Sequence, residues 1–230
     1  MATSFRRRSL RVSAGALAAA LSLSACTSDL RKSSPFWSTV TNTRPQKADD
    51  EVRAYADSLR FASMLFWFDG QSRSLIVLGG KTPEDQLSWY TAEKQAITTF
   101  GPFITRAIGT EVELRRTDFG AGWSVDVRSM VGKTLVRQTV VAQRGIEATA
   151  TLKSRFHDAG LTSIKVLGKT MPARRIDESM IADNRVRILN SYWVDPASGE
   201  WLKTRQQIIP TMAPVNTALL KSPQAQIPAG

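Results

Sequence analysis

The stretch Ile146-Glu-Ala-Thr-Ala-Thr-Leu-Lys153 alternates between apolar and polar side chains at every step. A period of two places the four apolar side chains on one face of a β-strand and the four polar ones on the other. The apolar-rich residues 135–142 precede this stretch across Arg144-Gly145, which is typical of a turn. We therefore predict an antiparallel hairpin with one buried face.

A second hairpin is predicted around Asp195-Pro196-Ala197-Ser198-Gly199, which separates residues 186–194 from residues 201–209. Proline presets one backbone angle of such a turn, and glycine accepts a positive φ. A third hairpin follows from two apolar runs on either side of Asp69-Gly70. The two runs of this third hairpin are residues 63–68 and 73–78, and further short strands are predicted at residues 87–90, 96–100 and 103–107.

One segment has helical spacing instead, because the apolar residues within positions 48–61 recur near a period of 3.6 with charges between them. The predicted fold is mainly β, an antiparallel sheet folded as a sandwich or open barrel, with this short N-terminal amphipathic helix. We expect a single β-rich domain over residues 47–222 and a loose tail over residues 223–230.

The N-terminus has the order of a bacterial signal peptide. Four arginines within the first eleven residues precede an apolar run at 12–23, which is too short for a transmembrane helix. Leu23-Ser24-Ala25-Cys26 resembles a lipobox, so residues 1–25 are predicted to be removed and Cys26 to carry lipid. A buried thiol behind an ordinary leader is the alternative. Because Arg11 interrupts a twin-arginine pattern, general secretion is favoured.

Residues 26–46 mix polar, charged and proline residues and are predicted to form a lipidated flexible tether. Loss of the four leader arginines lowers the net charge from +11 to +7. Such a charge favours lipid head groups, lipopolysaccharide or acidic polysaccharide over nucleic acid in the periplasm. Thr27, rather than aspartate, favours the periplasmic face of the outer membrane by analogy with enterobacterial sorting.

The residues needed for common catalytic sites are sparse. His157 is the only histidine, which excludes metal sites built on two histidines, and it is predicted to lie in a turn beside Asp158. Paired carboxylates could hydrolyse a glycan, but ordinary surface positions are the favoured interpretation of Glu84-Asp85, Glu111 with Glu113, and Asp177-Glu178. We therefore predict no catalytic residues, no metal and no cofactor.

Five residues are candidates for contact with a glycan or a partner protein. The aromatic rings of Trp89, Tyr192 and Trp193 match the C–H face of a sugar, although packing in the core explains them as well. The guanidinium groups of Arg174 and Arg175 suit carboxylate and phosphate, although a solvated basic surface is the favoured interpretation.

The chain resembles the YjbF/GfcB family of group 4 capsule and exopolysaccharide lipoproteins. The resemblance rests on Phe61-Ala62-Ser63-Met64, on Leu75-Ile76-Val77-Leu78-Gly79, and most strongly on Asn190-Ser191-Tyr192-Trp193-Val194-Asp195-Pro196 with the proline-marked exit that follows it. The segment 110–129 and the arginine-rich leader depart from the family pattern.

This resemblance implies an outer-membrane lipoprotein without known catalytic residues, associated with an outer-membrane barrel protein and a small periplasmic protein of the same export system. The favoured hypothesis is a non-enzymatic accessory factor in exopolysaccharide or capsule assembly or export. The alternatives are a periplasmic polysaccharide-modifying enzyme and a structural envelope lipoprotein.

Overall fold

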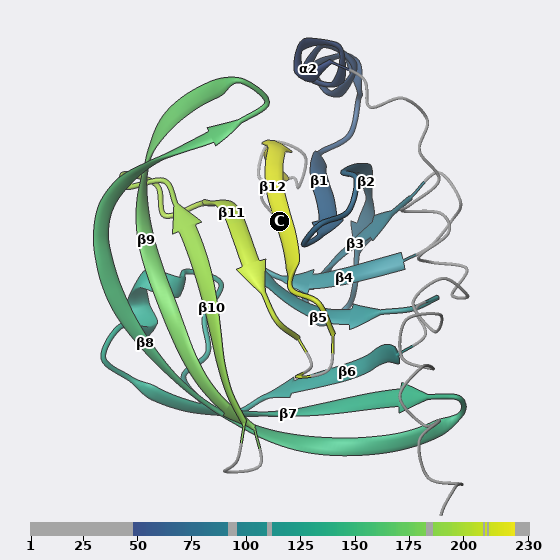
Figure 1. The fold of residues 1–230 in the computed structure, drawn as a ribbon, viewed down its shortest axis with the longest axis vertical. Helices are drawn as coiled ribbons and strands as arrows, with labels where there is room; N and C mark the ends of the chain where they lie inside the picture. The colour runs from purple at the N-terminus through teal and green to yellow at the C-terminus, as the bar shows by residue number, and fades with distance from the viewer. Residues whose placement is uncertain are drawn as a thin grey trace, which may run out of the picture.

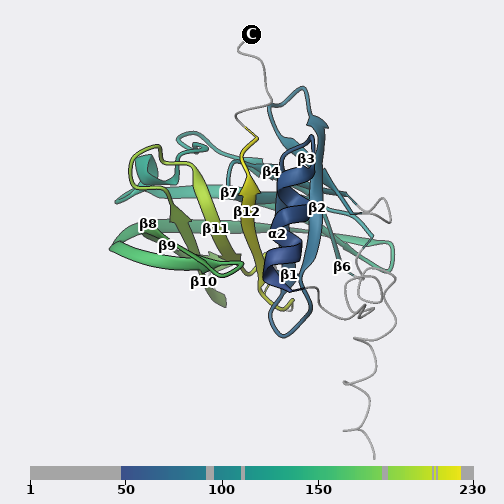
Figure 2. The same cartoon turned by 90° about the horizontal axis from the view of Figure 1, so that it is seen from above.

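The computed structural model describes residues 48–91, 96–109, 112–182, 186–208, 210 and 212–223. Within them, twelve antiparallel strands form a closed barrel, and the helix α2 (Asp49–Ser58) lies outside it (Figures 1 and 2). The strands are β1 (Ser63–Phe68), β2 (Ser74–Lys81), β3 (Leu87–Tyr90), β4 (Ala96–Phe100), β5 (Phe103–Ala107), β6 (Val112–Phe119), β7 (Thr134–Gln143), β8 (Ile146–Val166), β9 (Lys169–Ala182), β10 (Val186–Val194), β11 (Trp201–Gln206) and β12 (Val215–Lys221). A 3₁₀ helix, η2 (Val127–Met130), precedes β7.

Each strand pairs with the next along the chain, and β12 returns to pair with β1, placing Leu65 opposite Ala218 and Phe66 opposite Thr217. The mainly β antiparallel fold with a short N-terminal helix is therefore confirmed. The sandwich and the open barrel are wrong, because pairing between the first and last strands removes the edges that an open sheet leaves unpaired.

The long hairpin of β8 and β9 extends beyond its neighbours in the barrel. Strand β7 pairs with β8 only as far as Arg155, while β8 continues to Val166. The extension, residues 161–173, is called the arm here, and in Figure 1 it curls over toward α2. Arg53 of α2 fastens the arm by donating from Nη2 to the carbonyl oxygen of Val166 at 2.7 Å.

The predicted turn at His157 is wrong, because His157 lies in the middle of β8, opposite Asp177 of β9. The register shifts between Asp158 and Gly160, so the turn-like residues there form a bulge within the strand. The carboxylate of Asp158 accepts a hydrogen bond from the backbone N–H of Gly160 at 2.8 Å, which stabilises this local irregularity.

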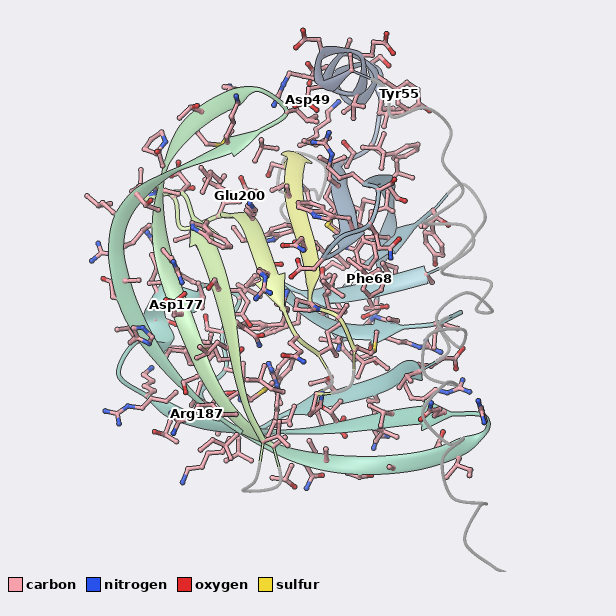
Figure 3. The ribbon with its side chains drawn as sticks, viewed as in Figure 1. Asp49, Tyr55, Phe68, Asp177, Arg187 and Glu200 are labelled. Atoms are coloured by element: carbon pink, nitrogen blue, oxygen red, sulfur yellow. The ribbon has the colours of Figure 1, made fainter. Side chains whose placement is uncertain are left out.

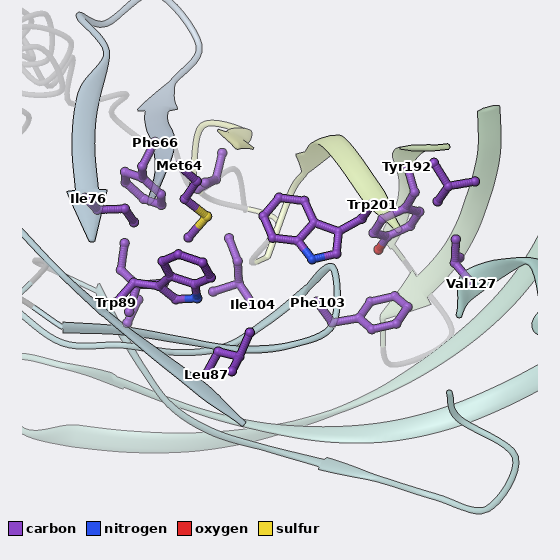
Figure 4. Close-up of a cluster of buried hydrophobic side chains, with 14 of the residues drawn as sticks. Met64, Phe66, Ile76, Leu87, Trp89, Phe103, Ile104, Val127, Tyr192 and Trp201 are labelled. Atoms are coloured by element: carbon purple, nitrogen blue, oxygen red, sulfur yellow. The ribbon is translucent and has the colours of Figure 1, made fainter. Parts of the chain in front are cut away.

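The inner face of the barrel holds the main apolar core. Figure 4 shows part of it, from Met64, Phe66 and Trp89 at one side to Phe103 and Tyr192 at the other. A second cluster lies where the arm meets the outside of β1 and β12, and it includes Leu65, Ile164, Val166, Leu167 and Ala218.

The strand predicted at residues 146–153 is confirmed, but burial alternates only from Ala150 onward, and residues 146–149 are exposed on both faces. Leu152 is buried, whereas Ile146, beside the β7–β8 turn, is 76% exposed. The predictions for residues 1–25, Cys26, the tether at 26–46 and all but the first residue of the tail lie outside the described residues. Within the described ranges, no helix is both long enough and apolar enough to cross a bilayer.

Candidate functional site

A buried carboxylate organises the polar interior of the barrel. Glu178 is fully buried, and its Oε2 accepts hydrogen bonds from the hydroxyl of Tyr192 at 2.6 Å and from Nδ2 of Asn190 at 2.8 Å. Its Oε1 accepts a bond from Oγ of Ser154 at 2.5 Å. Both oxygens of the carboxylate are therefore engaged by donors from neighbouring strands.

The buried guanidinium of Arg137 completes this group, which we call the Glu178 network: Glu178, Arg137, Ser154, Asn190 and Tyr192. Nη2 of Arg137 lies 3.3 Å from Oε1 of Glu178. The same guanidinium lies over the ring of Trp123, 5.0 Å from its centroid, and Nη2 contacts the sulfur of Met180 at 2.9 Å. The charge of Glu178 is thus compensated inside the barrel.

Strand register explains why these residues meet. On β9, Glu178 falls between Ile176 and Met180 in the inward phase of the alternation. Pairing places Asn190 of β10 directly opposite Glu178, and Phe156 of β8 opposite it on the other side. Four successive strands, β7 to β10, therefore contribute to the network.

Burial raises the pKa of Tyr192 well above its ordinary value, and the adjacent carboxylate of Glu178 adds to the effect. The phenol consequently stays neutral and keeps donating its hydrogen bond well into the alkaline range. A small pocket beside the network, lined in part by Arg137, Asn190, Gln206 and Gln207, has room for about one water molecule.

Two of the predicted contact residues point into the barrel. Trp89 and Tyr192 are both fully buried. The indole nitrogen of Trp89 donates to Oγ1 of Thr99 at 3.0 Å, and Tyr192 belongs to the Glu178 network. Neither ring presents a face to solvent, so neither is positioned to stack on a polymer outside the barrel.

The other three predicted contact residues lie on the outer face, where each already has partners. Arg174 forms an ion pair with Asp158, and Nε of Arg175 donates to Asp177 at 2.7 Å. The half-buried ring of Trp193 has the guanidinium of Arg175 at 5.7 Å from its centroid and the ammonium of Lys203 at 5.3 Å. Both neighbours are cations, and they come from the two adjacent strands.

Of the carboxylate pairs considered in the sequence analysis, Asp177 and Glu178 do not face each other. Asp177 lies on the outer face of β9 and Glu178 on the inner face, since adjacent strand residues point to opposite sides. Asp85 forms an ion pair with Lys81 in the β2–β3 turn. Glu113 binds Arg115, and Glu111 lies outside the described residues. The described residues contain no group of three or more His, Cys, Asp or Glu side chains suited to a metal ion.

A family model described as "Group 4 capsule polysaccharide lipoprotein gfcB, YjbF" matches residues 29–220, a span that begins before α2 and ends within β12. The chain belongs to the YjbF family. The family resemblance predicted from the sequence is therefore confirmed, and with it a link to capsule-associated lipoproteins.

The solved structure of the hypothetical lipoprotein YmcC from Escherichia coli K12 is similar to this YjbF-family chain, with a TM-score of 0.66 and 22% identity. The match covers 77% of this chain and 90% of that chain. At such identity, the likeness shows a shared fold. No curated protein matches the chain.

Sequence reasoning missed Arg137 and Ser154 in this YjbF-family barrel, although the pattern contained a signal. Arg137 occupies the same phase of β7 as the buried Leu135 and Thr139, and Glu178 shares the phase of Ile176. A cation that faces inward on one strand and an anion that faces inward on another are typical of a buried ion pair. The sequence does not say that the two strands bring these charges together.

Proposed function

We propose that this YjbF-family chain is an outer-membrane lipoprotein that acts as a non-enzymatic accessory factor in the assembly or export of exopolysaccharide or capsule. The observation that carries the proposal is the use of Glu178. Its two oxygens receive donors from Ser154, Asn190 and Tyr192, and Arg137 lies beside it. This arrangement ties four strands together, which is a structural role.

A polysaccharide-modifying enzyme would use its carboxylates differently. Glycoside hydrolysis requires two carboxyl groups on opposite sides of one bond, with room for a sugar between them. Asp177 and Glu178 instead face opposite sides of the barrel wall, and the pocket lined in part by Arg137 and Asn190 has room for about one water molecule. The geometry of the described residues favours the accessory role.

Lipid on Cys26 would hold the barrel at the periplasmic face of the outer membrane through residues 26–46. Partners in this proposal are an outer-membrane barrel protein and a small periplasmic protein of the same export system. Of the predicted contact residues, Arg174, Arg175 and Trp193 lie on the outer face and are available to a polymer or a partner there. Each would exchange an existing contact for the new one.

The test measures secreted polysaccharide in the wild type, a deletion strain, and the deletion strain complemented with Cys26→Ser, while membrane fractionation follows the protein. Deletion is expected to lower polymer output. The Cys26→Ser protein is expected to be absent from the outer-membrane fraction and not to restore polymer output. Unchanged polymer in all three strains would contradict the proposal and favour the structural envelope lipoprotein.

A matched pair of complementing variants tests the enzymatic alternative. Asp177→Asn removes the outward carboxylate of the Asp177-Glu178 pair, and Glu84→Gln changes an exposed acid in the β2–β3 turn. The accessory role predicts full polymer output with both variants at normal abundance. Loss of output with Asp177→Asn alone would support catalysis by that carboxylate.

A further inference from the structure

The outer face of β7 to β10 carries a mixed basic and apolar surface that the Glu178 network does not use. Strand register places Val136, Lys153, Ile181 and Arg187 in one row across the four strands. The adjacent row, two residues along each strand, contains Arg155 and Leu189. We call these six residues the outer patch: Val136, Lys153, Arg155, Ile181, Arg187 and Leu189.

The outer patch is accessible and carries a net positive charge. Leu189 is 61% exposed and Val136 is 46% exposed, and Ile181 is partly exposed, so all three aliphatic side chains reach solvent. Lys153, Arg155 and Arg187 are also exposed, and none of the three forms an ion pair among the described residues. Figure 3 shows Arg187 on the outside of the barrel near the start of β10.

The rest of the two rows contains no opposing charge. Thr134 and Ser179 occupy the remaining outward positions of these rows on β7 and β9. Among the residues that the structure describes, the acid that lies closest in register is Asp177, one row further along β9, and it is already bonded to Arg175 and Ser191. In the described parts of β7 to β10, three cations therefore lie beside aliphatic side chains, and the two rows contain no carboxylate.

We propose that the outer patch docks on the surface of a bilayer that contains anionic phospholipid. Lysine and arginine have long apolar stems, so their charged ends can reach phosphate while neighbouring aliphatic groups enter the headgroup region. The apolar members of the patch are Val136, Ile181 and Leu189, whereas sugar recognition uses aromatic faces. Charge and side-chain type together favour lipid over an acidic polysaccharide.

The position of the patch is compatible with the proposed anchor. Residues 26–47 lie between Cys26 and the first described residue, and their extended length is at most about 75 Å. This reach lets the barrel turn the outer patch toward the leaflet that holds the lipid. The inference rests on the proposed function only for that anchor, which brings the barrel to a membrane.

The test uses the full lipidated protein in phosphatidylcholine vesicles with and without phosphatidylglycerol. The sulfur of Cys26, the only cysteine, is consumed by lipid, so Leu189→Cys supplies one free thiol for a polarity-sensitive fluorophore. Ala197→Cys, in the exposed β10–β11 turn at the other end of β10, is the matched control. Vesicle flotation reports the anchor separately from the fluorescence.

Docking predicts a blue shift at position 189 in vesicles with phosphatidylglycerol and none at position 197. Replacing the three cations by glutamine is expected to reduce the docked-to-undocked ratio roughly 100-fold, since each cation at an anionic surface contributes about fivefold. A second variant, Lys153→Gln alone, is expected to reduce it about fivefold, and both variants are expected to float normally.

Three results would overturn the inference while leaving the anchor intact. Floating vesicles without a lipid-dependent shift at position 189 would show that the patch does not meet the bilayer. A shift in detergent that grows with protein concentration would assign the patch to a second copy of the chain. A shift caused by polygalacturonate in detergent, without vesicles, would assign it to acidic polysaccharide. A protein that fails to float contradicts the proposed function instead.

Discussion

Replacing Glu178 by glutamine tests whether the Glu178 network holds the barrel together. The substitution keeps the shape of the side chain, but it removes the charge that faces the buried guanidinium of Arg137. It also replaces one acceptor oxygen by an amide NH₂ group, which then faces hydrogen-bond donors in place of an acceptor. Breaking a buried pair by removing one partner costs about 3–5 kcal/mol, so we expect the free energy of unfolding to fall by that amount.

The assay is urea unfolding of the purified protein, followed by tryptophan fluorescence and circular dichroism, with Glu84→Gln as an exposed control. For a domain of this size, the expected loss of free energy corresponds to a melting temperature lower by about 6–20 °C. The control is expected to change the free energy of unfolding by less than about 0.5 kcal/mol. Combining Glu178→Gln with Arg137→Met should cost at least about 1 kcal/mol less than the sum of the single variants. A single-variant cost below about 1 kcal/mol, or strict additivity, would refute the reasoning.

Further predictions concern pH, backbone conformation and the arm. The raised pKa of Tyr192 means that the unfolded chain loses this proton first as pH rises, so wild-type stability declines above about pH 10. Measurement of unfolding free energy between pH 8 and 11 should show a shallower decline for Tyr192→Phe, and parallel curves would contradict the assignment. Gly145→Ala and Gly199→Ala both force alanine to positive φ, near +80° and +78°, at a cost of about 1–2 kcal/mol. Only Gly199→Ala also pushes a Cβ into the guanidinium of Arg128, which donates to the carbonyl oxygens of Pro196 and Ser198. In thermal unfolding, Gly199→Ala should therefore lower the free energy of unfolding by about 1 kcal/mol more than Gly145→Ala does. Arg53→Met removes the bond to Val166 and should speed amide hydrogen exchange at residues 164–166 about tenfold, whereas unchanged exchange would show that α2 does not fasten the arm.

Local patterns in the sequence predicted most of the strands correctly. The bounds of β3, β4, β5 and β10 agree with the predicted runs, because alternation and turn residues are properties of neighbouring positions. Strands β6, β9 and β12 were missed. In β9, Arg174, Arg175, Asp177 and Glu178 interrupt the apolar pattern, and only pairing with β8 and β10 keeps this segment extended.

The sequence by itself determined that the chain is a β-rich member of the YjbF family, since motif and periodicity are local. Closure was decided only by the tertiary structure, because it depends on pairing between β1 and β12 at opposite ends of the domain. The surroundings of Glu178 were likewise decided by the registers of β7 to β10. Those registers bring Arg137, Ser154 and Asn190 to one carboxylate from distant positions in the chain, and no pattern along a single strand specifies that meeting.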